Sequence, residues 1–155
     1  MLQRIASMLL LLVWLCALAA CDNPFTGPTR PLRTPTPMRV MALEGTSWTL
    51  TQLVVDGHGQ PLVPTTLITL QFEASESTYV GSSGCNYYSG TYHVTGTQIQ
   101  MLFGSVTLKG CAGPIMSQEV SYLNTLQRVR SFALSGVVLT LRDEQGRDVM
   151  AYRRT

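Results

Sequence analysis

The chain has 155 residues and a formal net charge of +2, from 11 Lys+Arg against 9 Asp+Glu. Four of the basic residues precede Leu43, so the chain from that point holds seven basic and eight acidic side chains. This near-neutral balance excludes the basic surface of a nucleic-acid-binding domain. Residues 43–155 are enough for one domain with one hydrophobic core and too few for two.

The first 20 residues have the layout of a lipoprotein signal peptide. Arg4 precedes an apolar run, residues 8–18, which ends on two alanines immediately before Cys21. A transmembrane helix needs roughly 18 or more apolar residues, and this run is shorter. The sequence Leu-Ala-Ala-Cys that ends at Cys21 resembles the bacterial lipobox, in which the cysteine is acylated with diacylglycerol and cleavage follows.

We therefore expect an exported protein, anchored by lipid on Cys21 to the cell membrane or outer membrane and facing the periplasm or the cell exterior. The alternative is an ordinary secretory signal that happens to precede a cysteine. After the acylated cysteine, residues 21–42 are rich in proline and threonine and lack a periodic apolar pattern, which predicts a tether. At no more than about 3.1 Å per residue, this segment spans up to roughly 60 Å.

From residue 43 onward, alternating apolar residues bounded by turn residues predict a series of β-strands. The Asp-Gly-His-Gly-Gln-Pro sequence at 56–61 is expected to form only a turn. The predicted strands are residues 47–55, 67–73, 77–82, 89–94, 98–103, 131–136, 137–143 and 148–154.

One segment, residues 114–130, changes from the period of a strand to that of a helix. Its apolar residues recur at steps of three and four, which predicts a single amphipathic helix with one buried face. The expected buried positions are Met116, Val120, Leu123, Leu126 and Val129. The whole pattern predicts an α+β fold: a strongly curved, barrel-like antiparallel sheet of about seven or eight strands with this helix covering one face or one open end.

Several motifs in this series match a known domain. The most distinctive are Gly84-Cys85-Asn86 with Gly90 and Tyr92, followed by Thr107-x-x-x-Cys111. The other matching positions are Leu43, Gly45, Trp48, Ile68, Leu70, Phe72, Glu119, Gly136, Leu139 and Leu141. Over nearly all of residues 43–153 the chain resembles the META domain of HslJ-like bacterial lipoproteins. The resemblance implies an α+β fold, an envelope location and an association with stress or antibiotic tolerance, and it supplies no catalytic residues and no cofactor.

The chain has four cysteines, of which Cys16 lies in the expected signal peptide and Cys21 is the expected lipid site. Cys85 and Cys111 remain as an even pair in an exported protein, which favours a disulfide. Closing that loop would stabilise the domain by about 3.5 kcal/mol in the chain-entropy model. A redox or metal-binding thiol pair is the alternative, although no Cys-x-x-Cys spacing and no neighbouring histidine supports it. We expect no metal.

The stretch GSSGCNYYSGTYH, residues 81–93, combines turn residues with three tyrosines. Its glycines at 81, 84 and 90 suit bends and positive φ angles, and its amides and aromatic hydroxyls suit contacts with a partner or a small amphipathic ligand. The candidate binding surface consists of Asn86, Tyr87, Tyr88 and Tyr92. The alternative is a purely structural corner whose tyrosines cap the sheet.

No catalytic set is recognisable, and we expect a non-enzymatic protein. The sequence Gly-Ser-Ser-Gly-Cys at 81–85 fails the Gly-x-Ser-x-Gly pattern of a nucleophile elbow at its last position. His93 lies on the solvent side of an alternating strand, and Glu119 lies in the first turns of the helix, where a negative charge suits the helix dipole.

Two functions remain open: an envelope module that binds another protein, with a role in stress tolerance, or a carrier or sensor that holds a small amphipathic ligand on the concave face of the sheet. They differ in whether the large side chains of the sheet fill its interior or line a cavity. The side chains in question are Trp48, Phe72, Tyr92, Met101 and Phe103.

Overall fold

The computed structural model describes residues 43–155. The expected signal peptide (1–20), the acylation site Cys21 and the tether (21–42) lie outside the described residues. Within the described part, no helix has both the length and the apolar character needed to cross a membrane.

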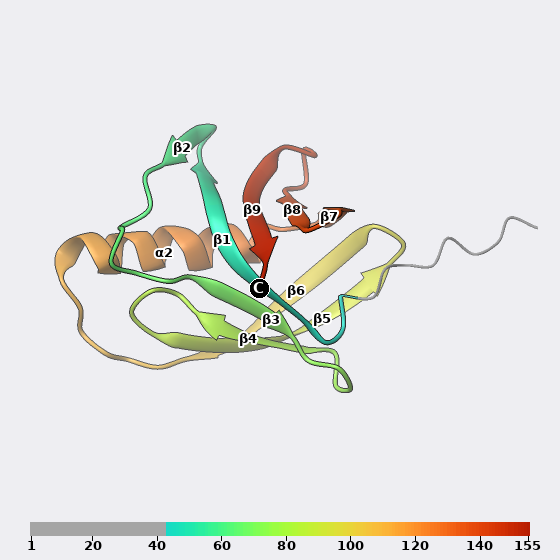
Figure 1. Ribbon diagram of the computed structural model, residues 1–155, viewed down its shortest axis with the longest axis horizontal. Helices are drawn as coiled ribbons and strands as arrows, with labels where there is room; N and C mark the ends of the chain where they lie inside the picture. The colour runs from blue at the N-terminus through green and yellow to red at the C-terminus, as the bar shows by residue number, and fades with distance from the viewer. Residues whose placement is uncertain (1–42) are drawn as a thin grey trace, which may run out of the picture. The chain divides into compact units, whose positions relative to one another are not determined.

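Nine strands and one helix make up the domain (Figure 1). The strands are β1 (Thr46–Val55), β2 (His58–Gln60), β3 (Thr69–Phe72), β4 (Thr78–Ser82), β5 (Tyr87–Thr95), β6 (Gln98–Val106), β7 (Ser131–Ser135), β8 (Val138–Arg142) and β9 (Asp148–Arg154). Helix α2 (Gly113–Gln127) lies between β6 and β7 in the chain. Every strand pair is antiparallel, which confirms the predicted α+β class with an antiparallel sheet.

The sheet closes on itself because β1 pairs with both β3 and β9. Trp48 lies opposite Leu70 on one side and opposite Arg154 on the other. The register between β1 and β9 shifts between Leu50 and Gln52, an irregularity of the kind that bends a strand and increases its twist. Such bending allows one ten-residue strand to belong to both halves of a curved sheet.

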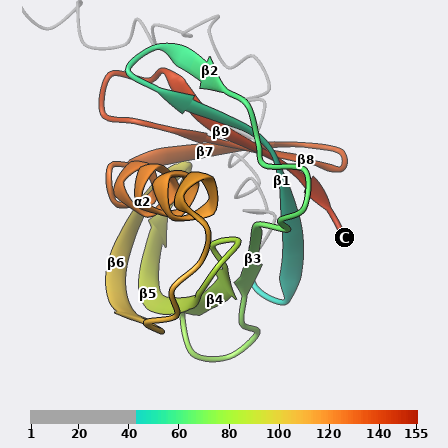
Figure 2. The ribbon, with the colours of Figure 1, turned by 90° about the vertical axis from the view of Figure 1, so that its left-hand side faces the viewer.

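The weakest junction of this ring lies between β6 and β7, which share only the pair Gln98 and Ser131. Figure 2 shows α2 lying between β5 and β6 on one side and β7 and β9 on the other. The helix thus covers the place where the sheet is least continuous, as expected for a helix at an open end of a curved sheet.

The prediction of seven or eight strands is wrong: the sheet has nine, and the strand that was not predicted is β2. The segment 56–61 was expected to be only a turn, but His58–Gln60 pairs with the end of β1 in the register Val55 opposite His58. Asp56 and Gly57 form a two-residue turn with positive φ angles of 51° and 80°. All three β2 residues are exposed, so this strand carries no apolar alternation from which it could be recognised.

The helix buries a more polar face than its sequence predicts. Its buried residues are Gln118, Glu119, Tyr122, Thr125 and Leu126. The expected position Val120 is exposed, and Val129 is buried but follows the end of the helix. The apolar periodicity misplaced this face because two of the buried polar side chains, Gln118 and Glu119, find hydrogen-bond partners in loops distant in sequence.

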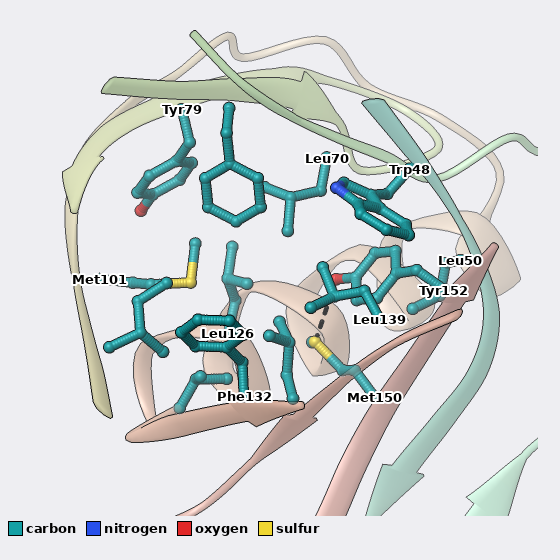
Figure 3. Close-up of a cluster of buried hydrophobic side chains, with 14 of the residues drawn as sticks. Trp48, Leu50, Leu70, Tyr79, Met101, Leu126, Phe132, Leu139, Met150 and Tyr152 are labelled. Atoms are coloured by element: carbon teal, nitrogen blue, oxygen red, sulfur yellow. Dashed lines mark hydrogen bonds between the residues drawn. The ribbon is translucent and has the colours of Figure 1, made fainter. Parts of the chain in front are cut away.

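Side chains fill the interior of the curved sheet (Figure 3). Of the five residues proposed to distinguish a packed interior from a cavity, Trp48, Phe72, Tyr92 and Met101 are buried in the core. Phe103 is exposed on β6 instead. In Figure 3, the side chains of Trp48, Leu70, Tyr79, Met101 and Tyr152 converge from several strands on the same space.

Candidate functional site

Cys85 and Cys111 form a disulfide, which confirms the predicted pair. Their Cα atoms are 6.0 Å apart, and the bond joins the β4–β5 turn to the loop that precedes α2. We call residues 83–87 and 107–111 together the disulfide corner. Residues 43–155 contain no group of three His, Cys, Asp or Glu side chains that could hold a metal ion.

Glu119 on α2 anchors the first half of the disulfide corner. Its carboxylate accepts hydrogen bonds from the Ser83 hydroxyl, from the Asn86 backbone amide at 2.9 Å and from Asn86 Nδ2 at 2.8 Å. The side chain is buried, so these three donors replace the water that an exposed carboxylate would bind. The first turn of α2 holds no acidic residue, so Glu119 lies too far along the helix for the predicted role at the helix dipole. Its observed partners lie more than 30 residues away in sequence and were not predicted.

Asn86 anchors the second half of the corner. Its Oδ1 accepts hydrogen bonds from Thr107 Oγ1 at 2.8 Å and from the Lys109 backbone amide at 2.7 Å. Its Nδ2 also donates to the Lys109 carbonyl oxygen at 3.2 Å. One buried amide side chain therefore fixes the loop after β6 and contacts the helix carboxylate at the same time.

The four residues of the candidate binding surface do not share one surface. Asn86, Tyr88 and Tyr92 are buried, and only Tyr87 is exposed, at 64%. Side chains alternate along a strand, so Tyr88 and Tyr92 on β5 point into the core while Tyr87 points out. Of that predicted surface, the structure leaves Tyr87 available for contact with another molecule.

Two glycines of this stretch leave room for a backbone carbonyl oxygen and a tyrosine ring: the Thr69 oxygen and Tyr88 at Gly81, and the Leu102 oxygen and Tyr79 at Gly90. A Cβ atom at Gly81 would lie 2.7 Å from the Tyr88 ring, and one at Gly90 would overlap the Tyr79 ring. Only Gly84 of the three has a positive φ, at 100°. The expectation that all three glycines supply positive φ angles is therefore correct for Gly84 alone.

Three buried tyrosine hydroxyls form a chain across the core. Tyr122 Oη lies 2.5 Å from Tyr88 Oη and accepts a hydrogen bond from Tyr152 Oη at 3.1 Å. The Tyr88 hydroxyl also donates to the Thr69 carbonyl oxygen at 2.7 Å. Burial raises the pKa of Tyr88, Tyr122 and Tyr152 well above the ordinary value, so these hydroxyls stay neutral and link β5, α2 and β9.

Large apolar side chains are exposed around the disulfide corner. Leu108 is 94% exposed, and Leu67, just before β3, is 62% exposed. The backbone amide of Thr107, just after β6, donates to the Tyr87 carbonyl oxygen on β5, and Leu108 follows Thr107 in the chain. The Lys109 ammonium lies 5.6 Å from the centre of the Tyr87 ring. Sequence reasoning missed both leucines, although an apolar residue in the loop between a strand and a cysteine is a usable signal for Leu108.

The model of the META domain family matches residues 41–155. Among curated proteins, no sequence matches this chain significantly. Solved structures, by contrast, share the fold. An NMR structure of a protein from Burkholderia xenovorans is 25% identical, with a TM-score of 0.63, and the match covers 75% of this chain and 86% of that one.

Two other solved structures are similar in fold alone. A crystal structure of a DUF4847 family protein from Bacteroides vulgatus has a TM-score of 0.53 and 14% identity, with 72% of this chain and 93% of that chain covered. An NMR structure of a further protein has a TM-score of 0.52 and 17% identity, with 71% and 89% covered.

Proposed function

Because the chain belongs to the META domain family, we propose that it is a non-enzymatic, lipid-anchored envelope module that binds another protein through the disulfide corner and acts in stress tolerance. The observation that carries this proposal is Leu108, which is 94% exposed on a loop that the rest of the corner holds rigidly. Tyr87 of the same corner is also exposed, and apolar side chains exposed together mark a contact surface in a way that a single one does not.

The corner is braced by more than one kind of interaction. The disulfide fixes Cys111, and the Asn86 side chain fixes the backbone of Lys109 from two sides. A loop ordered before binding loses little conformational entropy when a partner docks. Leu108 and Tyr87 thus form a preorganised apolar surface, and Lys109 adds one positive charge.

The proposed anchor is lipid on Cys21, supported by the apolar run and small residues that precede it. The proline-rich residues 21–42 would let the corner reach partners away from the membrane surface. The alternative function, a carrier with its ligand on the concave face of the sheet, has less support, because Trp48, Phe72 and Met101 occupy that space.

Site-specific photo-crosslinking in living cells tests the interaction. A photoreactive amino acid replaces Leu108 in one variant and Leu102 in another; Leu102 is also an exposed leucine, but it lies in the middle of β6, outside the corner. We expect a discrete cross-linked protein at position 108 and none at 102. Equal labelling at both positions, or none at 108, would contradict the proposed surface.

Membrane fractionation tests the anchor separately. Cys21→Ser should move the protein out of the membrane fraction, because the acylated thiol is removed. If the variant stays membrane-bound to the same extent, anchoring through Cys21 is wrong, while the interaction at Leu108 would remain testable.

A further inference from the structure

The outer face of the sheet contains a hollow of about 550 Å³ next to the disulfide corner. It lies over β1, β3, β4, β5 and β6, on the side of the sheet opposite the packed core. Its lining includes Thr69, Gln71, Val80, Ser82, Tyr87 and Ser89. A second hollow of about 560 Å³ lies over β5 and β6 and is lined in part by His93 and Arg130. The hollow next to the disulfide corner differs from it in being lined by uncharged hydroxyl, amide and aromatic side chains, which suit a neutral polar ligand.

The strand register arranges these side chains in two rows across the sheet. Gln71 lies opposite Val80, and Val80 lies opposite Ser89. In the neighbouring row, Ser82 lies opposite Tyr87 and its backbone amide donates to Thr69 Oγ1. Neighbouring strands are about 4.8 Å apart, so successive side chains in each row are separated by about that distance. This spacing is close to the length of one sugar ring.

Several polar groups in the hollow retain unused hydrogen-bonding capacity within the described residues. Thr69 Oγ1 accepts from the Ser82 amide and Ser82 Oγ accepts from the Gly84 amide, which leaves both hydroxyl protons free to donate. Gln71 Nε2 donates to Glu73, which leaves the Gln71 amide oxygen as an acceptor. The Ser89 and Ser105 hydroxyls bond to each other at 2.9 Å, and one proton of that pair is free.

The charge and apolar contacts of the hollow narrow the class of ligand. None of its lining side chains is charged, so it offers nothing to balance a phosphate, a sulfate or a metal ion. Val80 and the exposed Tyr87 ring provide apolar contacts between the hydroxyl groups. Lys109, over the Tyr87 ring, does not line the hollow.

We propose that this hollow binds a neutral oligosaccharide that carries acetamido groups and lies across β3 to β6. The sugar hydroxyls meet Thr69, Ser82 and Ser89, and a ring face packs against Tyr87. The acetamido group fits the adjacent pair of Gln71 and Val80. The Gln71 amide oxygen accepts a hydrogen bond from the acetamido N–H, and the Val80 side chain contacts the acetamido methyl group. This site goes beyond the proposed function, because it needs neither Leu108 nor a protein partner.

Ligand-observed saturation-transfer NMR on the purified, exported protein tests the site with chitotetraose as the probe. We expect saturation transfer to the sugar protons and none to a heparin-derived tetrasaccharide, whose sulfates find no cation in the hollow. Val80→Lys, which fills the floor with a charged chain, should reduce the signal at least about fivefold, since a bulky charge in a neutral site removes both space and complementarity.

Matched variants distinguish loss of the site from loss of the fold. Val138→Lys introduces the same charge at a strand position of similar exposure, 37% against 36% for Val80, but outside the hollow. This control and Leu108→Ser should keep full transfer, and Tyr87→Ala should weaken it. The proposal is overturned if the parent protein gives no saturation transfer to chitotetraose, or if Val80→Lys and Val138→Lys, with equal melting temperatures, bind alike.

Discussion

Glu119 on α2 receives two hydrogen bonds from Asn86, one from its backbone amide at 2.9 Å and one from its side-chain amide at 2.8 Å. Asn86 in turn bonds to Lys109 through both its Oδ1 and its Nδ2. The helix, the β4–β5 turn and the loop after β6 therefore meet at one pair of buried polar side chains.

Glu119→Ala should destabilise the domain by about 3 kcal/mol, because the Ser83 hydroxyl and two Asn86 donors would lose a buried acceptor. Urea denaturation followed by circular dichroism measures the loss. Glu144→Ala, at an exposed carboxylate in the β8–β9 turn, is the control and should change the free energy of unfolding by less than about 0.5 kcal/mol. Equal effects of the two substitutions would show that the buried network contributes little.

Loss of the disulfide should lower the free energy of unfolding by about 3.5 kcal/mol, from the entropy of closing a loop over the 26-residue separation. Cys85→Ala with Cys111→Ala removes the bond without leaving a free thiol. Thermal melting of this double variant, with and without reductant, provides the measurement, and reductant should lower the melting temperature of the parent protein only. An unchanged melting temperature in the double variant would contradict a stabilising bond.

Gly90→Ala should destabilise the domain by at least about 2 kcal/mol, because its Cβ would overlap the Tyr79 ring and the Leu102 carbonyl oxygen. Neither neighbour moves easily, since Tyr79 is buried and Leu102 pairs within the sheet. Gly110→Ala is the matched control, because a Cβ there meets no atom within 4 Å. Urea denaturation should therefore separate the two variants clearly; similar midpoints would mean that the sheet adapts at Gly90.

Stability should fall at alkaline pH because of the buried tyrosines. Burial raises the pKa of Tyr79 to about 12, and the pKa values of Tyr88, Tyr122 and Tyr152 are raised as well. A tyrosine whose pKa is higher in the folded state stabilises that state fully below the unfolded value of about 10, and this contribution is lost as the pH rises above it. The free energy of unfolding should therefore be level near pH 8 and decline above about pH 10.

Urea denaturation at several pH values, with tyrosinate absorbance recorded in parallel, checks this expectation. Tyr122→Phe should lessen the alkaline decline, because one of the groups that must stay neutral in the folded state is absent. It should also cost stability at neutral pH, because Tyr152 loses the acceptor of its hydrogen bond. A decline of the same steepness in both proteins would assign the alkaline effect to other groups.

Most of the fold followed from local patterns in the sequence, and the exceptions have physical reasons. Strands such as β3 and β8 alternate buried and exposed side chains, so their period is visible. β2 is exposed on every residue and depends on a turn at Asp56 and Gly57, so no period marks it. The disulfide followed from counting the cysteines of a chain that was expected to be exported.

The site was harder to predict because its members depend on distant partners. Glu119 is buried only because Ser83 and Asn86 approach it from another part of the chain, and a carboxylate alone in a sequence suggests exposure. The tyrosines of β5 were grouped by their closeness in sequence, whereas strand alternation sends Tyr88 and Tyr92 to one face and Tyr87 to the other. Alternation applied to this segment would have singled out Tyr87.

The closure of the sheet through β1 and β9 has a consequence for how the domain folds. β1 can complete its pairing only after β9, the last strand, has been made. For example, Thr51 Oγ1 donates to the Ala151 carbonyl oxygen across 100 residues of sequence. Contacts so distant along the chain make folding slow, because the entropy of closing a large loop is lost before the contact forms. During synthesis, the edge of β1 that pairs with β9 stays unpaired until β9 has emerged, and a chaperone has its longest opportunity to bind in that interval.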